Sequence, residues 1–192
     1  MLGFSAIKAG VSYLPLAVTI IISAGLASAL VTKVGFKPIL VAGMALISAG
    51  LFWFGQISPD GSFLSDVLGP SLVAAVGLGF AFVPQTIAAV SGVAERESGL
   101  ASGLINTSQQ VGGALGLALL STVAFPQIED AIVEAGGAPP SAAVLTDGYA
   151  DAFMVGAGIA LVGVVVAMTL IRGRDSRAHV ALGGADPVKT SA

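Results

Sequence analysis

The sequence predicts an all-α membrane protein with five transmembrane helices and no soluble domain. Of the 192 residues, 55% are apolar and only 10% are charged, whereas an ordinary soluble domain carries about 25% charged residues. Long apolar runs divide the chain, and none has Asp, Glu, Lys or Arg in its interior. A soluble fold of this size would need a charged exterior, so most of the surface is expected to face lipid.

Each apolar run reaches the ~20 residues that a helix needs to cross a ~30 Å hydrocarbon core. Continuous apolarity favours helices, because a helix satisfies its own backbone polar groups, whereas a barrel strand would be about ten residues of alternating polarity. Residues 1–172 are therefore expected to form the membrane domain, and the Gly/Ala/Asp/Ser-rich residues 173–192 a disordered cytoplasmic tail. The predicted helices are 12–31, 38–57, 68–91, 99–125 and 152–171.

The first run also has features of a signal peptide. Lys8, the apolar stretch 14–24 and Ala27-Ser28-Ala29 imitate its basic, apolar and cleavage regions. The run continues through Val31 and then meets a basic turn, which favours a spanning helix.

Charge in the linkers predicts the orientation. If Lys33 and Lys37 form a cytoplasmic turn and the helices alternate, every basic residue except Lys8 lies inside. Under the positive-inside rule the N-terminus is then outside the cell membrane and the C-terminus in the cytoplasm. The charged residues of the two outer loops are then all acidic: Asp60, Asp66, Glu129, Asp130, Glu134, Asp147 and Asp151.

Residues 99–116 carry the most informative polar pattern. Asn106 precedes Gln109 and Gln110 by three and four residues, so the three amides share a helix face. Amides in lipid need partners, which leaves two readings open: a face that lines or gates a substrate path, or hydrogen bonding between packed helices. Small residues here are typical of helices that approach closely, and the packing candidates are Gly99, Gly103, Gly112, Gly113 and Gly116.

Two further patterns lie in neighbouring runs. Pro84 inside the third run predicts a kink, and Gln85 beside it could meet the amide face; the favoured alternative is a kinked helix that serves only in packing. Phe52-Trp53-Phe54 is typical of an interfacial aromatic belt, not of a ligand site.

Enzymatic chemistry has little support. The chain has no Cys and a single histidine, His179, so thiolate chemistry and Cys-based metal binding are excluded. No membrane-embedded acid pair or Ser/His/Asp set is present, and no glycine-rich stretch resembles a phosphate-binding loop. We expect no enzyme activity, no cofactor, no metal and no nucleic-acid partner.

Four stretches carry a resemblance to a known family. They are 3–15 (GFSAIKAGVSYLP), 33–37 (KVGFK), 77–84 (GLGFAFVP) and 99–116 (GLASGLINTSQQVGGALG). Together they resemble the C-terminal part of the major facilitator superfamily, in its fourteen-helix drug:proton antiporter branch. The 33–37 turn departs from the family's full loop motif, because its aspartate and arginines are absent.

The resemblance covers about residues 3–172 and implies that the five runs correspond to the last five of fourteen helices. It implies proton-driven export of small hydrophobic or cationic compounds, with a binding site between two pseudo-symmetric halves. No carboxylate is expected in mid-membrane, where proton coupling would need one. We therefore expect an incomplete transporter, inactive alone, whose missing N-terminal half or another membrane subunit completes it. The alternative is a non-transporting scaffold or half-transporter partner that packs through its glycine-rich faces.

Overall fold

The computed structural model describes residues 6–58, 61–90, 93–134 and 136–171, and this part of the chain consists of helices joined by short connections, without strands. Five helical segments are long and apolar enough to cross a membrane, which confirms the predicted fold class of a multi-pass all-α protein. The predicted disordered tail, 173–192, lies outside the described residues. The elements are α1 (Ala6–Ser12), α2 (Leu14–Val34), α3 (Phe36–Phe54), the π-helical turn η1 (Phe63–Leu68), α4 (Gly69–Val90), the 3-10 turn η2 (Glu95–Glu97), α5 (Ser98–Glu134) and α6 (Ala142–Leu170).

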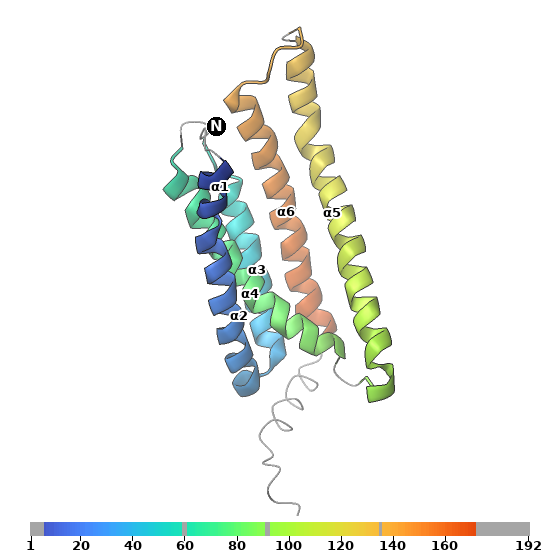
Figure 1. Cartoon of the computed structure of the whole chain (residues 1–192). Coiled ribbons are helices and arrows are strands. Elements are labelled where there is room, and N and C mark those ends of the chain that lie inside the picture. Colours follow the sequence, from blue (N-terminus) through green and yellow to red (C-terminus); the bar gives the residue numbers. More distant parts are fainter. Residues whose placement is uncertain (1–5, 59–60, 91–92, 135, 172–192) are drawn as a thin grey trace, which may run out of the picture.

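The long helices run antiparallel to their sequence neighbours (Figure 1). Helices α3 and α4 pack at the centre, α2 lies against α4, α6 lies against α3, and α5 packs mainly on α6. The α2–α3 turn, the α4–α5 link and the end of α6 lie at one end, here named the turn end. The α3–η1 and α5–α6 connections lie at the other, here named the hairpin end.

Glycines bring α3 and α4 into backbone contact. A Cβ built on Gly43 would lie 2.6 Å from the Ala81 nitrogen, and one on Gly77 would lie 2.6 Å from the Ile47 nitrogen. Gly50 meets Ala74 in the same way, at 2.8 Å from its nitrogen. Without a hydrophobic driving force between helices in lipid, such close van der Waals packing holds them together.

The outer helices are attached by similar contacts and by one side-chain hydrogen bond. A Cβ on Gly79 of α4 would lie 2.6 Å from Ser23 Cβ of α2. The Ser48 hydroxyl of α3 donates to the Ala157 carbonyl of α6 over 2.9 Å. Helices α2, α3, α4 and α6 are thus tied into one row.

The first predicted helix, 12–31, corresponds to α2, and the short helix α1 precedes it. Pro15 stands in the first turn of α2, where its missing N–H needs no partner. The same proline could not continue a helix from upstream without the loss of a backbone hydrogen bond. The chain therefore ends α1 at Ser12 and starts α2 at Leu14.

Helices α5 and α6 extend beyond the expected ranges 99–125 and 152–171. Pro126 lies inside α5, yet the helix continues because Ala124 and Ile128 are buried against α6, where Gly148 leaves room for the Ala124 carbonyl. Helix α6 begins earlier than expected because the Ser141 hydroxyl accepts a hydrogen bond from the Val144 N–H. At 1.5 Å per residue, the 37 residues of α5 measure about 55 Å, well beyond a ~30 Å hydrocarbon core.

Candidate functional site

A cavity between α4 and α5 brings together two of the polar residues singled out from the sequence. Gln85 of α4 and Gln109 of α5 both line it, and its volume is about 520 Å³. It lies towards the turn end, where the C-terminal part of α4 runs obliquely towards the start of α5 (Figure 1). The other lining residues are Ala89, Val93, Ala101, Leu104, Ile105 and Ser108.

The lining of this α4–α5 cavity is apolar with a few polar groups. Two carboxamides and the Ser108 hydroxyl can each donate and accept hydrogen bonds, and no charged residue takes part. Its volume falls within the range of small-molecule sites, about 300–1,000 Å³. The arrangement suits a small apolar molecule with a few hydrogen-bonding groups.

Pro84 lies directly before Gln85 and is one of the most completely buried side chains in the described chain. Because proline has no N–H, the Phe80 carbonyl one turn earlier loses its usual helical partner. The neighbouring Thr86 hydroxyl donates to the Phe82 carbonyl over 2.9 Å. The kink assigned to Pro84 stays a prediction, as does any role of that kink in the placing of Gln85.

Asn106 and Gln110 do not line the α4–α5 cavity. Both are exposed, on a face of α5 that they share with Gly99, Gly103 and Gly113. No heavy atom of the described chain lies within 4 Å of a Cβ built on any of these glycines, and the same holds for Gly112 and Gly116. The structure therefore leaves open the polar, glycine-rich half of α5, here named the α5 open face, and the packing predicted for it is untested.

The basic turn, in contrast, has a defined role in the fold. Gly35 closes the α2–α3 turn with φ of 87°, a left-handed conformation that glycine adopts without a steric penalty. Two residues later, the Lys37 ammonium donates to the Met168 carbonyl near the C-terminus of α6, over 2.7 Å. A cation at a helix C-terminus is favourable, so Lys37 ties α3 to α6, whereas Lys33 is exposed.

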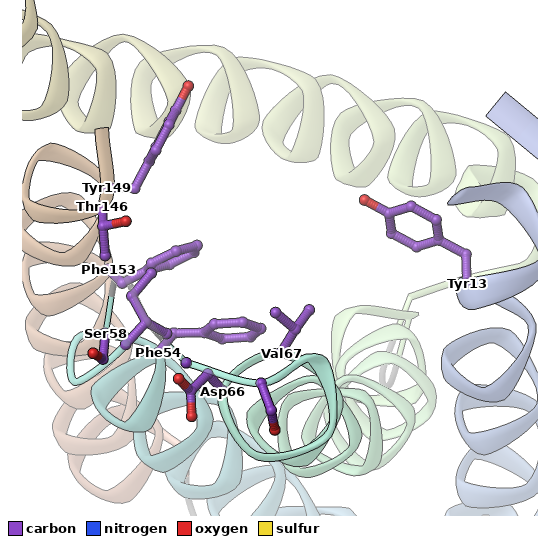
Figure 2. A pocket seen from close by; sticks show the side chains of 11 residues that line it. Tyr13, Phe54, Ser58, Asp66, Val67, Thr146, Tyr149 and Phe153 are labelled. Carbon is purple, nitrogen blue, oxygen red and sulfur yellow. The ribbon is translucent and has the colours of Figure 1, made fainter. Parts of the chain in front are cut away.

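A second cavity, of about 600 Å³, lies at the hairpin end (Figure 2). Phe54 of α3 and Phe153 of α6 are stacked, with ring centroids 4.8 Å apart, and both rings point into it. Tyr13 faces them from the junction between α1 and α2, and Asp66 lies on the border. The sequence analysis missed this cavity: it placed Phe54 in a lipid-facing belt with Phe52 and Trp53.

The belt assignment fits Phe52 and Trp53, which are 53% and 45% exposed. Phe54 differs because its helix turns it towards α6. Tyr149 and Phe153 could have distinguished Phe54 from its neighbours in the sequence, because these two aromatic residues lie one helical turn apart at the same predicted membrane end. Among the described residues, no group of three or more His, Cys, Asp and Glu side chains could hold a metal ion.

Comparison with known proteins decides the family. The sequence model of the Major Facilitator Superfamily matches residues 1–117, more than half of the chain. The chain belongs to the major facilitator superfamily. Members of this superfamily are transporters.

Superfamily relatives include several antibiotic exporters. The chain is 34% identical over 169 residues to the Cephamycin export protein CmcT of Amycolatopsis lactamdurans, which covers 88% of this chain and 32% of that protein. It is 31% identical over 185 residues to the Puromycin resistance protein pur8 of Streptomyces alboniger, covering 94% and 36%. The Tetracenomycin C resistance and export protein of Streptomyces glaucescens is 30% identical over 128 residues, covering 67% and 24%.

The chain therefore spans about a third of the length of the first two of these relatives.

Proposed function

We propose that this chain forms the last five helices of a proton-coupled efflux transporter for small hydrophobic or cationic molecules, and that it does not transport by itself. Its relatives are named for the export of antibiotics or for resistance to them. The chain matches only about a third of each of the first two. In this proposal, a further membrane segment about twice as long as this chain completes the transporter.

The observation that carries the proposal is the α5 open face. Asn106 and Gln110 are exposed on this face, and so is Leu117, seven residues after Gln110. Leucine tolerates lipid, but an amide in hydrocarbon without a partner costs several kcal/mol, roughly 4–8 by transfer to cyclohexane. Exposed amides beside exposed glycines are expected on a helix face against which further helices pack.

In the completed transporter, Gln85, Asn106, Gln109 and Gln110 contact the substrate or the gate. The α4–α5 cavity supports this role for Gln85 and Gln109, since it is apolar and carries convergent amides. The proton-coupling carboxylates belong to the other helices. All carboxylates described in the five spans lie near the hairpin end, namely Asp66, Glu129, Asp130, Glu134, Asp147 and Asp151.

The orientation forms part of the proposal. The turn end carries Lys33, Lys37 and Arg96 beside Glu95 and Glu97, whereas the hairpin end carries the six acidic residues named above and one basic residue, Lys8 of α1. Basic residues near helix ends favour the cytoplasmic side. We therefore place the turn end and the C-terminus in the cytoplasm and the hairpin end outside, in a cell membrane.

Transport by the chain alone and in combination tests the proposal. The purified chain is reconstituted into proteoliposomes with a pH gradient and ethidium as the probe, alone or with the N-terminal helices of the cephamycin export relative. We expect no gradient-driven flux from the chain alone and measurable flux from the combination. Gradient-driven flux from the chain alone would overturn the proposal.

A matched pair of variants links the result to the α5 open face. Gly103→Leu places a large side chain on that face, whereas Leu100→Ala changes an exposed α5 residue that is not part of the amide face. Gly103→Leu should leave the stability of the chain alone unchanged and abolish flux and co-purification in the combination. If the chain binds the added helices but no flux appears with any partner, the chain acts as a non-transporting scaffold.

A further inference from the structure

Two lysines and the end of α6 form a positively charged region at the turn end, here named the lysine corner (Figure 1). Lys33 lies in the last turn of α2 and is exposed, and Lys37 lies in the first turn of α3. Gly35 turns the chain between them, so the two lysines stand on adjoining helix ends. Among the described residues, the acidic residues of the turn end belong to the α4–α5 link and not to this corner.

Contacts between the three helices hold the lysine corner in place. The Lys37 ammonium donates to the Met168 carbonyl of α6 over 2.7 Å, which uses one of its three N–H donors and leaves its charge unchanged. Ile171, directly after α6, packs against the buried cluster that contains Phe36. Arg172 is the next residue in the sequence, outside the described part of the chain, and adds to the positive charge that follows α6.

An exposed apolar stripe of α2 leads to this corner. Ile22 and Leu26 are 57% and 54% exposed. They share a helix face with Lys33, because spacings of four and seven residues return to the same face. The rise from Ile22 to Lys33 is about 16 Å, close to one leaflet of a ~30 Å hydrocarbon core. A positive charge at the end of an apolar stripe one leaflet long matches the shape and polarity of one phospholipid molecule.

We propose that the lysine corner binds the headgroup of an anionic phospholipid, whose acyl chain lies along the apolar stripe of α2. Attraction between an anionic membrane surface and one nearby lysine raises affinity about fivefold. A zwitterionic lipid also offers a phosphate, but its own cationic group is repelled by the same lysines. The assignment of this lipid to the cytoplasmic leaflet rests on the proposed orientation, whereas the binding itself does not.

The test is native mass spectrometry of the whole chain released from detergent micelles. The chain is titrated with phosphatidylglycerol or with phosphatidylcholine of the same acyl chains. We expect the first phosphatidylglycerol to bind about 5- to 25-fold more tightly, the range for one or two lysines. Glycerol phosphate in large excess should not displace it, because it lacks the acyl chains that contact α2. The experiment needs no further helices and no transport, so its outcome is separate from that of the flux experiment.

Matched variants assign the binding to the lysine corner. Lys33→Gln should weaken phosphatidylglycerol binding about fivefold, whereas Lys33→Arg should preserve it. Lys33 is exposed, so neither variant disturbs the packed interior. Arg96→Gln removes an equal charge from the same end of the bundle. The Arg96 Nε lies 3.7 Å from the Glu97 carboxylate in the α4–α5 link, so this control should change affinity less than about twofold.

Equal affinity of the wild-type chain for the two lipids would overturn the proposal. Equal weakening by Lys33→Gln and Arg96→Gln would contradict it too, because that result indicates attraction by the overall charge of the turn end. Displacement of the lipid by glycerol phosphate would also refute it, since the site would then recognise a free phosphate and not a lipid.

Discussion

At the scale of single residues, glycine has two opposite environments in this bundle. Gly43 of α3 and Gly77 of α4 each lie against the backbone of the opposite helix. No heavy atom of the described chain lies within 4 Å of a Cβ built on Gly103 or Gly112 of α5. The sequence analysis assigned packing only to the second group. The first group also forms a pattern in the sequence, because small residues recur at helical spacing at 43 and 50 in one run and at 74, 77 and 81 in the next. Spacing alone does not show which of these small residues contact another helix.

Substitution of these glycines should separate the two environments. Gly43→Ala places a methyl group 2.6 Å from the Ala81 nitrogen, so α3 and α4 must move apart. We expect a loss of about 1–3 kcal/mol, the usual effect of overpacking, and a lower melting temperature in detergent. Gly112→Ala meets nothing within 4 Å and should leave stability unchanged or raise it by up to about 1 kcal/mol. Equal effects of the two variants would contradict the α3–α4 contact.

Ser48 provides a second test at this scale. Its hydroxyl donates to the Ala157 carbonyl in a part-buried position between α3 and α6. Ser48→Ala should destabilise the chain by about 0.5–1 kcal/mol, measured by unfolding in mixed detergent micelles, since interhelical hydrogen bonds in membrane proteins average about 0.6 kcal/mol. Ser102→Ala, on the exposed part of α5, serves as the control and should change nothing measurable.

At the scale of the elements, the existence and number of the spanning helices could be predicted, but several ends could not. Apolar run length is a strong signal because the bilayer sets it. The ends of α5 and α6 at the hairpin end depend instead on packing between the two helices, at Ala124, Ile128 and Gly148. The sequence alone does not show that tertiary contact. The proline at 126 and the acidic residues nearby therefore predicted a loop.

The same limit applies to the candidate sites. The grouping of Asn106 with Gln110 followed from helix periodicity, and the pairing of Gln85 with Gln109 at one cavity agrees with the suggestion that Gln85 could meet the amides. The hairpin-end cavity could not be predicted. Its walls come from the α1–α2 junction, α3, the α3–η1 connection, η1 and α6, and their proximity depends on the order of the helices in the row.

The contact of α3 with the end of α6 leads to a prediction at this scale. Lys37→Met removes the ammonium that donates to the Met168 carbonyl, so the last turn of α6 should fray more often. Hydrogen–deuterium exchange of amides in that turn should become about two- to fivefold faster, the factor expected for a charge at a helix terminus. Lys33→Met removes an equal charge from the same turn, and its exposed side chain predicts no change in α6.

At the scale of the whole molecule, two ends with different charge predict one orientation in the cell. The chain has no cysteine, so single cysteines can be introduced without background. Ala138→Cys lies at the exposed hairpin end and Ala94→Cys at the exposed turn end. A membrane-impermeant maleimide should label Ala138→Cys in intact cells and Ala94→Cys only after permeabilisation. The reverse pattern would overturn the proposed orientation.

The placement of α5 at the edge of the row has a consequence for synthesis. Helix α5 precedes α6 in the chain, yet α6 is its main partner, and α6 in turn packs on α3. During translation, at roughly 5–20 residues per second, α3 and α4 can close on each other as soon as both have left the ribosome. Helix α5 then waits for seconds beside the translocon until α6 emerges. For that interval Asn106, Gln109 and Gln110 would expose their amides to lipid, and a membrane chaperone would bind this part of the nascent protein first.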